Sequence, residues 1–125
     1  MSITTINIKD KNYPKLLKEI YDPPEKIYIL GNIEAVGDLP FAVVGTRKMS
    51  REGKEIASRI VKNLAQNGFT IISGLALGID GVAHQAALEA KGKTVAVLGS
   101  GLNNIYPSAH KKLADQIIAS GGAII

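Results

Sequence analysis

The sequence contains no cysteine and no tryptophan, and only 5% of its 125 residues are aromatic. Without cysteine, the chain can form no disulfide bond, thiolate nucleophile or thiolate zinc site. It has no apolar run long enough to cross a bilayer. Its first residues also lack the apolar core and small-residue cleavage pattern of a secretory signal. We therefore expect a cytoplasmic protein with no membrane partner, stabilised by packing alone.

The length and the hydrophobic content of 46% suit one compact domain with one core. The formal net charge is only +4, but the cations are unevenly placed. Six of them fall within 16 residues that contain only two acidic residues, Glu52 and Glu55. They are Arg47, Lys48, Arg51, Lys54, Arg59 and Lys62. By itself such a run is typical of a solvated helix surface, so its meaning depends on the neighbouring motifs.

Apolar runs at 41–44, 69–72, 93–98 and 121–125 alternate with segments of helical period. In the first helical segment Ile56, Ile60, Val61 and Leu64 form one apolar stripe. We predict an α/β fold: an open, mostly parallel Rossmann-like sheet with helices on both faces.

Residues 1–40 differ in texture and are predicted to be a lead-in segment, with a helix near 13–20 and a strand at 26–30. This segment would pack on a main domain of residues 41–125. The later helices are expected at 81–91 and 108–119, with Gly92 as a C-terminal cap, Ser108 as an N-terminal cap and a stop at Gly121.

The first glycine-containing loop is VGTRKMS, which follows the run at 41–44. Ligands of open parallel sheets bind beyond the carboxyl ends of the strands. Gly45 permits close backbone approach, while Thr46 and Ser50 supply hydroxyl groups. Arg47 precedes a helix whose positive dipole end disfavours a cation, and a bound anion would resolve that conflict. The loop therefore favours a phosphate site over a purely structural turn.

The second loop, SGLALGIDGVAH, follows the run at 69–72. Gly74 and Gly78 allow tight turns, and Ser73 offers a hydroxyl group at the strand end. Asp80 suits the cap of the next helix and shares a helical face with His84. The pair is either an acid–base dyad or, in the interpretation we favour, a cap plus a buried, hydrogen-bonded histidine.

The third loop, LGSGLNNIYP, begins with Gly99, Ser100 and Gly101. Its glycine pattern resembles a dinucleotide fingerprint only weakly, because the third glycine is missing and no helix opens directly after it. Tyr106 is either a platform for base stacking or, more commonly for such a residue, a packing residue fixed by Pro107.

Several other site types do not fit the sequence. Gly45 and the Gly53–Lys54 pair have the wrong spacing for a Walker loop, and Glu55 stands where its hydroxyl residue belongs. The two histidines, His84 and His110, lie in different elements without a carboxylate cluster. We expect no metal, no cofactor and no catalytic set.

Taken together, four segments resemble the DNA-processing protein A family, also called DprA or Smf. These segments are YPKLLKEIYDPPEKIYILGN, AVVGTRKMSREG, NGFTIISGLALGIDGVAHQAAL and KTVAVLGSGLNNIYPSAHKKL, in that order. Members are bacterial proteins that bind single-stranded DNA during natural transformation, help load the recombinase RecA and form dimers. They are not established enzymes. The resemblance therefore implies single-stranded DNA, a RecA-type recombinase and a second copy of the chain as partners.

The resemblance also implies a set of phosphate-binding residues in the three loops. The matching positions are Gly45, Thr46, Arg47, Ser73, Gly74, Ala76, Gly78, Asp80, Gly99, Gly101, Tyr106 and Pro107. The physical interpretation of the loops agrees, and adds Ser50, Ser100 and, as support, His84. Neighbouring Lys48, Lys54, Lys111 and Lys112 are expected to extend an electrostatic track.

The sequence departs from the family after Ile125, where members continue with further strands. We therefore expect an incomplete sheet, with an unpaired apolar edge near Ile124 and Ile125 that promotes self-association. The alternative function is that of a nucleoside-monophosphate enzyme of the phosphoribohydrolase type, although its PGGxGTxxE signature is absent. A nucleotide-sensing or purely structural fragment is the third possibility.

Overall fold

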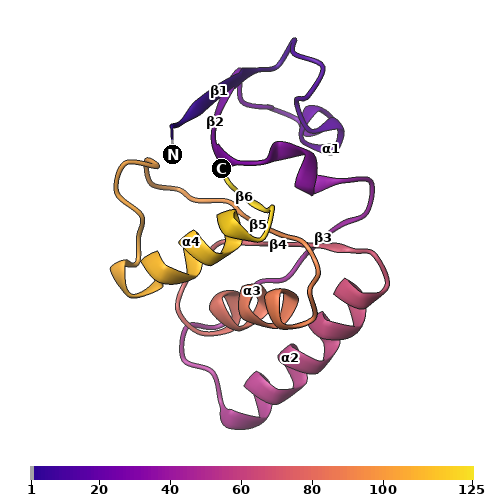
Figure 1. Ribbon diagram of the computed structural model, residues 1–125, viewed down its shortest axis with the longest axis vertical. Coiled ribbons are helices and arrows are strands. Elements are labelled where there is room, and N and C mark those ends of the chain that lie inside the picture. The colour runs from indigo at the N-terminus through magenta and orange to yellow at the C-terminus, as the bar shows by residue number, and fades with distance from the viewer. Residues whose placement is uncertain (1) are drawn as a thin grey trace.

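The computed structural model describes residues 2–125 and contains one six-stranded sheet with the strand order β1-β2-β6-β5-β4-β3 (Figure 1). The strands are β1 (Thr4–Asn7), β2 (Lys26–Gly31), β3 (Pro40–Ala42), β4 (Thr70–Ser73), β5 (Thr94–Ala96) and β6 (Ala123–Ile124). The α-helices are α1 (Lys15–Lys18), α2 (Arg51–Gln66), α3 (Ile79–Glu89) and α4 (Lys111–Ala119). Two 3-10 turns, η1 (Ile33–Val36) and η2 (Ser108–His110), complete the described elements.

Strands β3, β4, β5 and β6 are parallel, and each pairs with the next one along the chain. Because every right-handed crossover steps in the same direction, helices α2, α3 and α4 cover the same face of the sheet. They lie side by side with α3 in the middle (Figure 1). The predicted α/β fold with an open, mostly parallel sheet is confirmed. The helices were predicted on both faces, but the three long ones share one face, and of the described helical elements only the four-residue α1 and the turn η1 pack on the other.

The helix face contains two of the three hydrophobic clusters. Val61 of α2 and three alanines of α3 pack on Ile71 of β4, while Leu113 and Ile117 of α4 pack on Ile124 of β6. Helix α2 begins at Arg51 because Ser50 caps it: the Ser50 hydroxyl accepts a hydrogen bond of 3.0 Å from the Gly53 amide.

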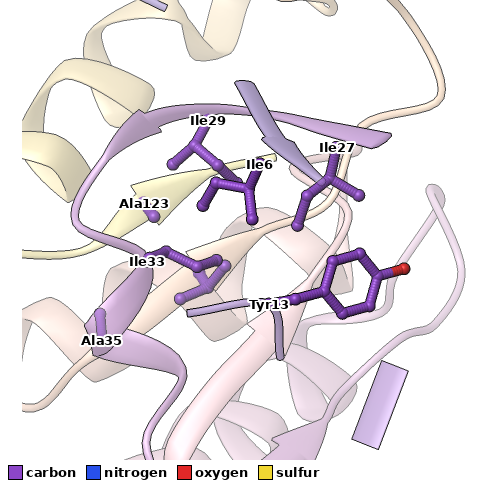
Figure 2. Close-up of a cluster of buried hydrophobic side chains, with 8 residues drawn as sticks. Ile6, Tyr13, Ile27, Ile29, Ile33, Ala35 and Ala123 are labelled. Carbon is purple, nitrogen blue, oxygen red and sulfur yellow. The ribbon is translucent and has the colours of Figure 1, made fainter. Parts of the chain in front are cut away.

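The opposite face is covered by the N-terminal residues. Figure 2 shows the cluster formed by Ile6, Tyr13, Ile27, Ile29, Ile33, Ala35 and Ala123, to which Val95 also belongs. The Tyr13 hydroxyl donates to the Pro24 carbonyl at 2.7 Å, and the Thr70 hydroxyl donates to the Ala35 carbonyl at 2.9 Å. The lead-in segment thus supplies two strands of the sheet as well as the cover of its second face.

The predicted unpaired edge at Ile124 is wrong. Strand β6 lies inside the sheet, parallel to β5 and antiparallel to β2, and Ile124 is fully buried. The sheet ends instead at β1 and β3. The position beside β6 that we expected to be empty is occupied by β2, an antiparallel strand from the N-terminal segment. The sequence pattern did not reveal this pairing, because the two strands are far apart in the chain.

Two predicted caps are also wrong. The residue with left-handed backbone at the end of α3 is Lys91, with φ of +59°, and not Gly92. Gly92 is required instead by helix packing. A Cβ atom on Gly92 would lie 2.7 Å from the Cβ of Ala65, so the glycine lets α2 approach closely. Ser108 makes no capping hydrogen bond. Gly121, with φ of +94°, ends α4 as predicted.

Candidate nucleic-acid interface

A cavity of about 230 Å³ opens beyond the carboxyl ends of β3, β4 and β5. The three predicted loops meet there, as expected for adjacent parallel strands. The lining residues are Arg47, Gly74, Ala76, Leu77, Leu98, Gly99, Ser100, Tyr106 and Pro107. Arg47, Gly74, Ala76, Gly99, Ser100 and Tyr106 are therefore brought together, and their assignment as phosphate contacts stays a prediction.

Two large side chains at this cavity are accessible. Arg47 is exposed and makes no ion pair with any carboxylate in residues 2–125. Tyr106 is 67% exposed, whereas Pro107 beside it is buried. The exposure of the ring favours the stacking platform over the packing role for Tyr106. Both side chains are therefore accessible from solvent.

The position of Arg47 is fixed by the start of α3. The Ile79 amide donates to the Thr46 carbonyl at 3.1 Å, and the Thr46 hydroxyl accepts from the Lys48 amide at 3.1 Å. Gly78 has φ of +82°, and a Cβ atom there would lie 2.7 Å from the Cα of Arg47. The backbone of Gly78 therefore packs directly against the backbone of Arg47, and no side chain fits between them.

Asp80 does not cap α3 as predicted. Gly78 occupies the cap position, and the buried Asp80 carboxylate turns back to accept the amide protons of Gly74 at 3.0 Å and Gly45 at 3.4 Å. These two amides thus already have an anionic partner inside the protein. The Gly45 amide is therefore not free to bind a ligand, because the Asp80 carboxylate already accepts its proton.

Free amides lie on the other wall of the cavity. Gly99 and Ser100 follow β5, and neither backbone N–H donates a hydrogen bond within the described part of the chain. These two residues line the same cavity as Arg47, so its guanidinium and their backbone N–H groups are potential donors at one site. Such a set suits an anionic oxygen group.

Other predicted residues lie outside the cavity. Ser50 caps α2, and Ser73 is buried and donates to the Val43 carbonyl at 2.5 Å. Gly101 lines an adjoining apolar groove next to β2, which shares Leu98 and Ser100 with the cavity. Lys54 and Lys112 line a groove on the helix face, and Lys48 and Lys111 are exposed.

His84 lies fully buried between α3 and the sheet. Its Nδ1 is 2.7 Å from the Thr94 hydroxyl oxygen, and that hydroxyl donates its own proton to the Ile71 carbonyl. Nδ1 therefore carries the imidazole proton, and Nε2 has no partner. Burial lowers the pKa of His84 to about 4, partly opposed by the Asp80 carboxylate. The pair is no acid–base dyad, and the buried, hydrogen-bonded histidine is confirmed.

Two features at this site were not visible in the sequence. Leu75 is buried with a left-handed φ of +62°, and its carbonyl accepts from Nδ1 of His110 at 2.7 Å. The second is the double acceptor role of Asp80. The His110 bond and the bond of Asp80 to Gly45 each join groups from different loops. The spacing of residues in the sequence does not indicate which loops lie close together. No three histidine or carboxylate side chains among residues 2–125 come together as metal ligands.

The sequence model of the DNA recombination-mediator protein A family matches residues 4–125. The chain belongs to this family. Among curated relatives, DNA processing protein DprA of Bacillus subtilis is 40% identical over 116 residues, which are 92% of this chain and 39% of the relative. DprA of Streptococcus pneumoniae is 43% identical over 113 residues, 90% of this chain and 40% of the relative. The family resemblance of the sequence is thereby confirmed.

Solved structures of the family agree. The X-ray structure of DprA from Streptococcus pneumoniae superposes with a TM-score of 0.88 at 40% identity, covering 98% of this chain and 42% of that one. DprA from Helicobacter pylori, whose structure was studied for its single-stranded DNA binding mode, superposes at 0.82 with 33% identity, covering 98% and 54%. The chain spans about two fifths of the length of the curated relatives above. None of the helices among residues 2–125 has the length and apolar character needed to span a membrane.

Proposed function

We propose that this chain binds single-stranded DNA through backbone phosphates, with Arg47 as the principal contact. The observation that carries the proposal is an exposed arginine without an ion-pair partner, lining the same strand-end cavity as the unbonded amides of Gly99 and Ser100. The site lies where ligands of open parallel sheets bind. The DNA-binding mode studied for the Helicobacter pylori relative supports the choice of ligand.

The roles of the groups follow from their chemistry. The planar guanidinium of Arg47 suits two oxygens of one phosphate, and the Gly99 and Ser100 amides suit a neighbouring oxygen. Tyr106 offers a ring on which one base can stack regardless of its identity. Binding of this kind is strong in low salt and carries little sequence preference.

The buried Asp80 carboxylate does not prevent anion binding. Its charge is balanced locally by two amide protons and by the N-terminus of α3, where it lies in the first turn. None of the residues that line the cavity is acidic. This composition supports a binding protein rather than a phosphoribohydrolase, whose chemistry needs a carboxylate at the ligand.

We extend the proposal to the biological role. Its support is the family's description as a recombination mediator, together with the DNA-processing names of its curated relatives. On this proposal the chain acts in the cytoplasm on single strands taken up during natural transformation. It passes them to a RecA-type recombinase while paired with a second copy of itself.

The test is fluorescence anisotropy of a labelled oligothymidine across a salt series. Replacing Arg47 with alanine should weaken binding and reduce the slope of log K against log salt by about 0.7 for one lost phosphate contact. The control is Lys18→Ala, which removes an equal charge from exposed α1, away from the cavity. Equal behaviour of the two variants, or binding that ignores salt, would overturn the proposal.

A further inference from the structure

A second cavity, of about 490 Å³, lies on the helix face, where α3 forms the floor and α2 and α4 form the walls. Figure 1 shows these three helices side by side. The lining residues are Met49, Lys54, Ser58, Gly78, Gly81, Val82, Gln85, Ala86, Glu89, His110, Lys112, Leu113 and Gln116. We call it the helix-face groove.

The charges in the helix-face groove favour an anion. Lys54 of α2 and Lys112 of α4 stand on opposite walls, and neither forms a salt bridge within residues 2–125. The only acidic lining residue is Glu89, whose carboxylate is 3.2 Å from the ammonium of Lys62. The remaining polar lining groups, such as Gln85 and Gln116, are neutral and can donate hydrogen bonds.

His110 adds a fixed ring to the same groove. Its Nδ1 donates to the Leu75 carbonyl, since a carbonyl can only accept. That bond orients the imidazole against Gly81, where a Cβ atom would lie 2.6 Å from Cε1 of His110. Nε2 makes no hydrogen bond to any described residue. The ring therefore presents a polar edge whose position is set by the backbone.

The helix-face groove lies next to the strand-end cavity along three chain segments. In each segment one residue lines the cavity and a nearby one lines the groove. The residues of the cavity are Arg47, Leu77 and Pro107, and their counterparts in the groove are Met49, Gly78 and His110. A chain-like ligand that extends from the cavity along these segments reaches the space lined by Lys54 and Lys112.

We infer that the helix-face groove is the second segment of a single-stranded DNA path, in which Lys54 and Lys112 contact phosphates of nucleotides next to those held at Arg47. This inference rests on the proposed function. A continuous polyanion is the ligand class that uses both spaces together, because its charges repeat along a flexible chain. A mononucleotide would occupy only the strand-end cavity.

The test compares oligothymidines of about 4 and about 16 nucleotides, the range of single-strand site sizes in binding domains. The double variant Lys54→Gln/Lys112→Gln should bind the longer strand roughly 2- to 30-fold more weakly, with a salt slope lower by about 1.4. Its affinity for the shorter strand should equal that of the unaltered protein. The control Lys15→Gln/Lys18→Gln removes the same charge from exposed α1.

A gain-of-charge variant gives an independent measurement. Gln116→Lys adds a cation to the exposed wall of the groove and should tighten binding of the longer strand alone. The inference is overturned if the Lys54/Lys112 variant matches the α1 control at both lengths while Arg47→Ala still weakens binding. If Arg47→Ala changes neither length, the proposed function itself fails. The two failures are thereby distinguishable.

Discussion

The Asp80 carboxylate accepts a hydrogen bond of 3.0 Å from the backbone amide of Gly74, which joins the first turn of α3 to the end of β4. Its other oxygen accepts from Gly45, beyond the end of β3. One buried side chain therefore holds two strand-end loops in register with each other. The geometry of Arg47, two residues after Gly45, depends on that connection.

Replacing Asp80 with asparagine tests this role. The amide side chain has only one accepting oxygen, so one of the two loop amides is left facing an NH2 group. We expect the free energy of unfolding to fall by about 1–3 kcal/mol, the usual cost of an unsatisfied buried group. Urea denaturation measures it, with exposed Asp115→Asn on α4 as the control. Equal midpoints for the two variants would contradict the loop-joining role.

Gly78 and Gly68 form a matched pair for testing close approach. Both have a left-handed φ, of +82° and +89°, but a Cβ atom meets Arg47 only at Gly78 and meets nothing within 4 Å at Gly68. Gly68→Ala should cost about 1–2 kcal/mol from backbone conformation alone. Gly78→Ala should cost more and should also weaken DNA binding. If both substitutions have the same effect on stability and on anisotropy, the backbone contact behind Arg47 has no role.

The depressed pKa of His84 makes stability depend on pH. Above about pH 6.5 the imidazole is neutral in both states, so it contributes no pH dependence. Between pH 6.5 and 4 the unfolded chain takes up a proton that the folded protein excludes. Stability should therefore fall as pH falls, by up to about 3 kcal/mol over that window.

The comparison is with His84→Gln, which keeps an N–H group but does not titrate. Urea unfolding at several pH values gives the free energy of unfolding of each protein. Because the carboxylates titrate in both proteins, the difference between the two curves isolates the histidine. That difference should shrink toward low pH, and parallel curves would show that His84 titrates normally.

The contact between Gly92 and Ala65 can be tested by a double-mutant cycle. Gly92→Ala places two Cβ atoms 2.7 Å apart and should cost about 1–3 kcal/mol. Adding Ala65→Gly removes the opposing methyl group, so the double variant should be more stable than the sum of the single changes by at least about 0.5 kcal/mol. Strict additivity would mean that α2 moves away at no cost.

The sequence predicted the parts of the fold that depend on local pattern. The strands β3 to β6 coincide with continuous apolar runs, and α2 with a stripe of helical period. These local patterns identified each element as a strand or a helix. Strand β1 was missed because TTIN buries only Ile6. The place of β6 was misjudged because its partner β2 is distant in the chain. Ile56 and Ile60, expected on the packed stripe, are 52% and 54% exposed, since Val61 and Ala65 face the sheet.

The candidate site divides in the same way. Arg47, Gly74, Gly99 and Tyr106 come together because carboxyl ends of adjacent parallel strands share one edge, which the strand pattern already implies. The bonds of Asp80 and His110 were not predictable, because each joins a side chain to the backbone of another loop. Such bonds depend on ångström-scale positions rather than on residue type.

The pairing of β2 with β6 makes the two-residue strand Ala123–Ile124 the only bridge between the N-terminal hairpin and the parallel strands in the described sheet. Backbone pairing between the hairpin and the parallel strands therefore requires the closure of a loop that spans most of the chain, which is entropically costly and slow. We expect the β2–β6 ladder to be among the last parts of the sheet to form, even though η1 and the hairpin side chains already contact β4 and β5.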